Sequence, residues 1–235
     1  MKAAERIIVA LDTPDIEIAR GLVEVLTPEF GHFKTGLEFF CSGGPEAVRN
    51  LQTSGAELFL DLKLHDIPNT VGGAARALGE LGVWMTNLHA SGGPEMMRTA
   101  REALPDALLL AVTVLTSFAE EDFRSYVGTS TTVEDTVRRW AVAAKESGLD
   151  GVVCSPKEIV AVREEIGKDF LIVTPGIRPR WAAKGDQRRV TTPAEALELG
   201  ADYLVIGRPI TASPDPREAA ERIAKEIEGS GVYDY

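Results

Sequence analysis

The chain has 235 residues, 44% hydrophobic and 26% charged, a composition typical of a soluble globular protein. Its formal net charge of −11 argues against nucleic acid or an anionic membrane surface as a partner, since both bind through basic charge. Residues 1–6 are charged and lead into a short apolar run, so we expect neither a signal peptide nor a membrane span, and a location in the cytoplasm.

Short apolar runs alternate with helical patterns along the whole chain. The expected strands cover residues 7–11, 32–36, 57–63, 83–89, 107–115, 151–154, 170–174 and 203–206. Helices are expected over about 15–26, 43–53, 68–81, 94–104, 132–147, 193–199 and 216–228. Because there is no linker, the alternation predicts the α/β class and a single (β/α)8 TIM barrel over residues 1–235. An open doubly wound sheet is the alternative, but the chain has no G-x-G-x-x-G after the first strand and no P-loop.

The third expected strand carries its charges on one face. Side chains alternate along a strand, so the leucines share one face while Phe59, Asp61 and Lys63 share the other. Asp66 follows three residues after Lys63, so that one ammonium group is flanked by two carboxylates. Such a cluster costs stability unless function requires it. A surface salt bridge is the alternative, although the leucine face indicates a strand that is covered by helices.

Polar residues also follow most of the other strands. In a barrel of this kind the active site lies at the C-terminal ends of the strands. The residues expected there are Asp12, Lys34, Asp61, Lys63, His89, Thr116, the turn 175–178, Gly207 and Arg208. Each one alone could simply terminate a strand. Together, two lysines facing two or three carboxylates suggest a preorganised charge network.

The last two strands carry a different signal, which points to a phosphate. Glycines beside Arg178 and Arg208 let the backbone approach a ligand, and the two arginines supply positive charge. The loops after strands seven and eight are where such barrels bind phosphate. The polar segment 178–189 is expected to close as a lid. Within it Gln187 could donate to a phosphate or a base, unless it is a solvated loop residue.

The stretch 61–70 resembles the signature of the orotidine 5′-phosphate decarboxylase family. Further stretches similar to that family are 9–12, 33–36, 112–117, 173–178, 185–188 and 206–210. The resemblance implies a homodimeric lyase that needs no metal or cofactor. Such an enzyme converts orotidine 5′-monophosphate to uridine 5′-monophosphate and CO2, the last step of de novo UMP biosynthesis.

The resemblance also implies which residues perform the reaction. Asp61 and Lys63 would act from one subunit, while Asp66, Ile67 and Thr70 would reach into the partner's site. Loss of CO2 leaves an electron pair in the plane of the ring, where the π system cannot delocalise it. Lys63 would place a cation beside this carbanion and then protonate it.

The substrate contacts that the resemblance implies run along the whole nucleotide. Asp12 and Lys34 would hold the ribose, and Thr116 would contact the pyrimidine. The phosphate would lie at the ends of the last two strands. The full expected set of substrate-binding residues is Asp12, Lys34, Ile67, Thr70, Thr116, Pro175, Arg178, Gln187, Gly207 and Arg208.

Two other functions remain open. One is a metal-dependent phosphosugar aldolase or decarboxylase resembling hexulose-phosphate synthase, in which a similar D-x-K-x-x-D motif serves an enediolate reaction with magnesium. There the second strand would end in a metal-binding carboxylate, whereas this chain has Lys34. The other is a non-catalytic barrel that binds a phosphorylated ligand, but a mere binder has no need of a lysine between carboxylates.

The remaining histidines and cysteines are expected to be structural. His32 and His89 are expected to pack, and His65 to face solvent or an interface. Cys41 and Cys154 lack metal-ligand spacing, so both are expected to be reduced packing residues.

Overall fold

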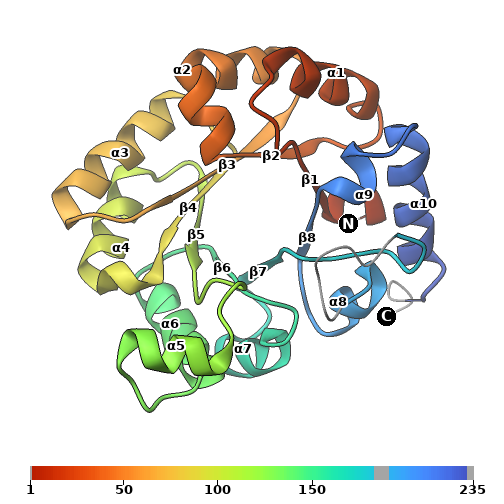
Figure 1. Ribbon diagram of the computed structural model, residues 1–235. Helices are drawn as coiled ribbons and strands as arrows, with labels where there is room; N and C mark the ends of the chain where they lie inside the picture. The colour runs from red at the N-terminus through yellow and green to blue at the C-terminus, as the bar shows by residue number, and fades with distance from the viewer. Residues whose placement is uncertain (1, 183–190, 232–235) are drawn as a thin grey trace.

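The computed structural model describes residues 2–182 and 191–231, and its eight parallel strands close into one barrel (Figure 1). The strands are β1 (Ile7–Ala10), β2 (His32–Gly36), β3 (Glu57–Leu64), β4 (Met85–His89), β5 (Leu108–Val112), β6 (Gly151–Val153), β7 (Leu171–Thr174) and β8 (Tyr203–Ile206). They follow one another around the ring in chain order, and β1 pairs with both β2 and β8. The predicted TIM barrel is therefore confirmed, and the open sheet is excluded.

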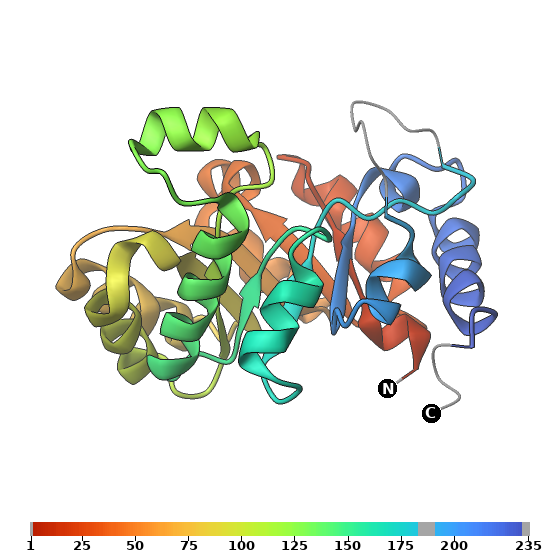
Figure 2. The ribbon, with the colours of Figure 1, turned by 90° about the horizontal axis from the view of Figure 1, so that it is seen from below.

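Helices surround the barrel on its outer side (Figure 1). They are α1 (Ile16–Leu26), α2 (Leu37–Thr53), α3 (Pro68–Glu80), α4 (Gly93–Ala103), α5 (Glu120–Val127), α6 (Val133–Glu146), α7 (Ile159–Ile166), α8 (Pro193–Glu198), α9 (Arg208–Thr211) and α10 (Pro216–Glu228). Two 3-10 turns, η1 (Ala3–Arg6) and η2 (Ala90–Gly92), precede β1 and α4. Figure 2 shows α5 standing away from this ring at one end of the barrel.

The structure differs from the expected elements at the start of α2, at the end of β5 and in three additional helices. Helix α2 begins at Leu37 rather than at residue 43, and Gly44, with φ of 60°, kinks it where the start was expected. Strand β5 ends at Val112 instead of residue 115, because the chain then turns and Thr113 bonds the carbonyl of Val153 through both its N–H and its hydroxyl. Helices α5, α7 and α9, each of eight residues or fewer, were not predicted.

Side-chain alternation along the strands separates two apolar layers. On β1, Ile8 points into the barrel, whereas Ile7 and Val9 pack in the layer between strands and helices. The barrel interior is filled by Ile8, Ala10, Phe59, Met85, Leu110, Val173, Tyr203 and Val205. On β3 the leucines pack outward and Phe59 inward, which confirms the predicted faces of that strand.

Two aspartates at the starts of strands stabilise the end of the barrel that lies opposite the strand C-termini. The Oδ2 atom of Asp150 accepts the N–H of Leu109 at 2.7 Å and pairs with Arg101 at 2.5 Å. The Oδ2 atom of Asp202 likewise accepts the N–H of Ile172 at 2.8 Å, and it pairs with Arg163 at 2.7 Å. Each carboxylate joins two neighbouring strands to an outer helix.

Candidate active site

Two adjoining cavities lie at the C-terminal ends of the strands. The inner cavity, of about 210 Å³, is lined by charged groups of β2 and β3 and by apolar side chains of β5, β6 and β8. The outer cavity, of about 270 Å³, is lined mainly by residues that follow β1, β7 and β8. Both are lined by Lys34, Asp61, Pro175 and Val205, so together they form one continuous site. The residues that line it suit a ligand with one largely apolar end and one charged end.

Four side chains with alternating charge connect the two cavities. The Nζ atom of Lys34 lies 3.0 Å from Oδ1 of Asp12 and 3.4 Å from Oδ2 of Asp61. The Nζ atom of Lys63 lies 2.5 Å from Oδ1 of Asp61. The structure therefore brings Asp12, Lys34, Asp61 and Lys63 together as expected. Within one chain, however, it is Lys34 rather than Lys63 that lies between two carboxylates.

Asp61 stays ionised in this cluster although it is buried. Burial is the largest single influence and raises the pKa of its carboxyl group, but the surrounding charges and hydrogen bonds, those of the ammonium groups of Lys34 and Lys63 first, together hold the pKa below its usual value. Hydrogen bonds from Lys63 and Asn87 act in the same direction. Asp61 is thus a fixed negative charge beside the inner cavity at neutral pH.

The backbone of β3 is irregular at Lys63. Its pairing with β4 shifts register between Leu60 and Leu64. Lys63 has φ of 53°, a left-handed conformation that is uncommon for a residue with a side chain. Such local irregularity is often found where a strand redirects a functional side chain. Here it occurs at the residue whose ammonium group lines the inner cavity.

Asn87 is a site residue that the sequence reasoning missed. Its Oδ1 atom accepts the backbone N–H of Lys63 at 2.8 Å, and its Nδ2 atom donates to Oδ1 of Asp61 at 2.7 Å. Only 1% of Asn87 is exposed. The sequence signal for it was its position two residues after Met85. Side chains alternate along a strand, so both residues point into the barrel interior.

Asp66, Ile67 and Thr70 lie at the surface rather than in this chain's cavities. The carboxylate of Asp66 accepts the N–H of Ile67 at 2.6 Å, and within residues 2–182 and 191–231 it forms no ion pair with Lys63. Ile67 is 66% exposed, just before Pro68 begins α3, and Thr70 is exposed in the first turn of that helix. The three residues therefore form an exposed segment beside the site.

The expected phosphate residues line the outer cavity, as far as the structure describes them. Arg178 is buried, Arg208 is exposed, and both border this cavity together with Pro175 and Gly207. A side chain at Gly207 would contact Ala10, since an added Cβ would lie 3.4 Å from the Cβ of that residue. Gln187 and residues 183–189 of the expected lid lie outside the described part of the chain.

The inner cavity has a largely apolar wall beside Thr116. Thr116 and Leu115 follow β5 and line this cavity, together with Val112 and Val153. Cys154 also lines it, and burial raises the pKa of its thiol far above the usual range, so it is inert packing as expected. Cys41 is also a free cysteine, but it is exposed on α2, so the expectation that it packs was wrong.

The three histidines lie outside the charge cluster itself. His65 is exposed, and its ring centroid lies 5.4 Å from that of His89. Burial lowers the pKa of His89, and the neighbouring His65 and Lys63 lower it further, against a smaller opposing effect of Asp61. His32 stacks on Trp84 with ring centroids 4.2 Å apart, as expected of a packing residue.

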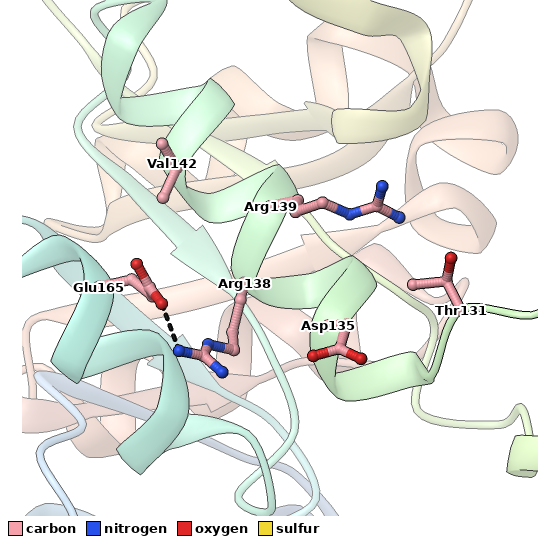
Figure 3. Close-up of a pocket in the computed structure, with 6 residues that line it drawn as sticks. All are labelled: Thr131, Asp135, Arg138, Arg139, Val142 and Glu165. Atoms are coloured by element: carbon pink, nitrogen blue, oxygen red, sulfur yellow. Dashed lines mark hydrogen bonds and ion pairs between the residues drawn. The ribbon is translucent and has the colours of Figure 1, made fainter.

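A larger hollow of about 490 Å³ lies on the outer surface between α6 and α7 (Figure 3). It is open to solvent, and Arg138 pairs there with Glu165 across the two helices. None of the residues expected at the site lines it. Size alone therefore does not identify the functional cavity, whereas the gathering of charged groups at the strand ends does.

Residues 2–182 and 191–231 contain neither a metal-binding cluster nor a membrane-spanning helix. No three His, Cys, Asp or Glu side chains are grouped so that they could hold a metal ion. No helix in these ranges is both long and apolar enough to cross a membrane.

The chain is similar to known proteins over most of its length. A model of the orotidine 5′-phosphate decarboxylase / HUMPS family matches residues 5–223. The orotidine 5′-phosphate decarboxylase of Moorella thermoacetica is 56% identical, covering 97% of this chain and 94% of the relative. That of Syntrophomonas wolfei is 49% identical, covering 97% and 100%. The crystal structure of the Lactobacillus acidophilus enzyme superposes with a TM-score of 0.85 at 39% identity, covering 95% of this chain and 99% of the other.

Proposed function

The chain belongs to the orotidine 5′-phosphate decarboxylase / HUMPS family, and on this premise we propose that it converts orotidine 5′-monophosphate to uridine 5′-monophosphate and CO2. This reaction is the last step of de novo UMP biosynthesis. The observation that carries the proposal is the alternating cluster of Asp12, Lys34, Asp61 and Lys63 at the junction of the two cavities. The curated relatives that are about half identical to the chain carry the name of this decarboxylase.

The two cavities suit the two ends of the nucleotide. The pyrimidine would occupy the inner cavity, against Thr116 and the apolar wall. The phosphate would occupy the outer cavity, beside Arg178, Arg208 and the backbone of Gly207. The ribose would then lie at the junction, where Asp12 and Lys34 can bond its hydroxyls. Binding energy gained at the phosphate would help to order the distant reacting end.

The chemical step requires a cation beside the carbon that loses CO2. The bond between C6 and the carboxyl group breaks, and its electron pair stays on C6 in the plane of the ring. The ammonium group of Lys63 stabilises this carbanion and then transfers a proton to C6. Asp61 lies 2.5 Å from Nζ and holds the cation at the inner cavity. The ionised carboxylate of Asp61 also disfavours the substrate carboxylate in the ground state.

The exposed segment with Asp66, Ile67 and Thr70 completes the site of a second copy of the chain. Ile67 is an apolar side chain exposed beside a catalytic cavity, which suits an interface between subunits. In the homodimer, Asp66 would supply a second carboxylate near the partner's Lys63. Dimerisation would therefore be part of catalysis.

The proposed enzyme acts without a metal or cofactor, in the cytoplasm where nucleotide biosynthesis takes place. The alternative is the metal-dependent phosphosugar enzyme of the hexulose-phosphate synthase type, and the name of the matching family includes HUMPS beside the decarboxylase. Lys34 argues against it, because its ammonium group lies between two carboxylates and would repel a divalent cation there.

Ultraviolet absorbance tests the proposal and the alternative together. Chelator-treated protein is mixed with orotidine 5′-monophosphate, and the orotate band is followed while the product is quantified. We expect the band to fall as one equivalent of uridine 5′-monophosphate forms. An unchanged band with folded dimer present would overturn the proposal. Turnover of a phosphosugar that is lost with the chelator and restored by magnesium would favour the metal-dependent alternative.

A further inference from the structure

Lys63 adopts a backbone conformation that its own side chain disfavours. It is the only non-glycine residue with a positive φ in the part of the chain that the structure describes. A left-handed backbone brings Cβ close to the following carbonyl oxygen, so it persists only where neighbouring groups enforce it. Asp61, on the same strand, must also keep its carboxylate buried. Lys63 and Asp61 both lie near the C-terminal end of β3, where they line the inner cavity.

The side-chain amide of Asn87 satisfies both requirements at once. Its carbonyl oxygen accepts the N–H of the left-handed Lys63, which the shifted ladder between β3 and β4 leaves available. Its NH₂ group donates to the same Oδ1 atom of Asp61 that accepts the ammonium proton of Lys63. One planar amide thus fixes the backbone of the lysine and the carboxylate that holds the lysine's head group.

The chemistry of this contact specifies asparagine. A carboxylate there would have no proton to give Asp61 and would repel it, and an apolar side chain of equal size would bond neither partner. Glutamine would carry the amide on a longer stem. A polar group in the barrel interior costs stability unless it is paired, and Asn87 is paired on both sides.

We propose that Asn87 is a positioning residue for the decarboxylation, acting through Asp61 and the backbone of Lys63 to direct the ammonium group into the inner cavity. This inference rests on the proposed function. The opposing interpretation is that Asn87 is simply a buried hydrogen-bonding residue that stabilises β4. The two interpretations differ in whether its loss changes the chemical step or only the stability of the fold.

Thr86, the neighbouring residue on β4, provides a matched control. It is fully buried, and its hydroxyl donates to the carbonyl of Leu60 on β3 at 2.8 Å, so it also joins these two strands. Its side chain points away from the barrel interior, because side chains alternate along the strand. Thr86→Val therefore removes a buried bond between the strands without touching the charge cluster.

The test compares Asn87→Leu with Thr86→Val in kcat, KM, affinity for uridine 5′-monophosphate and thermal unfolding. We expect Asn87→Leu to lower kcat by about 100-fold through misplacement of the lysine. Its affinity for uridine 5′-monophosphate should stay within about threefold of wild type, since the phosphate contacts are untouched. Thr86→Val should lower the unfolding temperature and leave kcat within about twofold of wild type.

The pH dependence of kcat gives a second readout that a structural role would not change. The groups that face the carboxylate of Asp61 are Lys34 from β2, Lys63 from β3 and Asn87 from β4. Without the amide donor, the charged form of Asp61 loses one hydrogen bond. The acid limb of the kcat profile of Asn87→Leu should therefore move to higher pH.

The outcomes separate this inference from the proposed function. Wild-type protein that does not consume orotidine 5′-monophosphate would refute the proposed function itself. Active wild type together with an Asn87→Leu variant that keeps its kcat and acid limb would overturn the positioning role. So would a kcat loss no larger than that of Thr86→Val. If Asn87→Leu does not fold, the smaller Asn87→Ser variant, which reaches neither partner, is measured against the same expectations.

Discussion

The ammonium nitrogen of Lys63 lies 2.5 Å from a carboxylate oxygen of Asp61, although the strand that carries both residues turns left-handed at the lysine. On a regular strand, residues two positions apart share a face about 6.6 Å apart. The lysine side chain therefore folds back along β3 to meet the carboxylate. This contact holds the ammonium group beside the inner cavity, as a preorganised charge arrangement requires.

The first prediction separates the chemistry of Lys63 from its effect on stability. Lys63→Gly removes the ammonium group and also relieves the left-handed backbone, which glycine adopts at little cost. We expect kcat to fall at least about 1,000-fold, because both the cation and the proton donor are lost. Thermal unfolding should show a higher midpoint for Lys63→Gly than for Lys63→Ala. A kcat close to wild type in either variant would refute the mechanism.

The second prediction concerns the shared site. Lys63→Ala and Asp66→Ala proteins are each expected to be inactive, but a hybrid dimer of the two would contain one intact site. If subunits exchange randomly, half of the dimers are hybrids and each has one working site of two. Mixing should therefore restore about a quarter of the wild-type activity.

A mixture of Lys63→Ala with Asp61→Ala is the matched control for this experiment. These two residues contact each other within one chain, so no hybrid of the two variants contains an intact site. That mixture should stay inactive. Recovery in the control, or no recovery with Asp66→Ala despite demonstrated exchange, would contradict a site shared between subunits.

The barrel and most of its charge cluster could be predicted from the sequence, because both depend on local patterns. Alternation placed Phe59 and Asp61 on the face opposite the leucines, and the strand ends identified Lys34 as their neighbour on the adjacent strand β2. Alternation could also have placed the side chain of Asn87 inside the barrel, but its two hydrogen bonds and the left-handed backbone of Lys63 could not be predicted in this way. Both depend on the register between β3 and β4, which shifts between Leu60 and Leu64. Packing of the two strands decides this shift, and the sequence pattern of either strand alone does not reveal it.

The third prediction is a loss of stability in mild acid that involves His89. Burial lowers the pKa of this residue, and His65 and Lys63 add to the effect, so the folded protein favours the neutral ring. Below the ordinary value of 6.5 the unfolded chain binds a proton that the folded chain resists. The stabilisation that the neutral ring contributes is therefore full above pH 6.5 and is lost as the pH falls through the folded pKa.

Denaturant unfolding of wild type and His89→Gln at pH 7.5 and 5.5 measures this effect. The free energy of unfolding should fall less between the two pH values in the variant than in wild type. The comparison at pH 7.5 alone reports any loss of packing from the substitution. An equal decrease in both proteins would show that His89 does not cause the acid sensitivity.

The fourth prediction concerns the opposite end of the barrel. Asp202 accepts the N–H of Ile172 and pairs with Arg163, whose guanidinium group also donates to the carbonyls of Gly167 and Gly200. Asp202→Ala leaves a buried N–H and a partly buried cation without this partner, which should cost about 2–4 kcal/mol of stability. The kcat should be unchanged, because β7 and β8 begin here and carry their site residues at the other end.

Arg217→Ala is the control for Asp202→Ala, since it also removes an ion pair that joins distant parts of the chain. Arg217 pairs with Glu29 and Glu221 on the surface, where water screens the charges, so its loss should change stability far less. Denaturant unfolding and kcat are measured for both variants. If the two substitutions lower the free energy of unfolding equally, the contacts of Asp202 stabilise the barrel no more than a surface ion pair does. If Asp202→Ala lowers kcat in the folded protein, the two ends of the barrel are coupled, because a pure loss of stability leaves the rate per folded molecule unchanged.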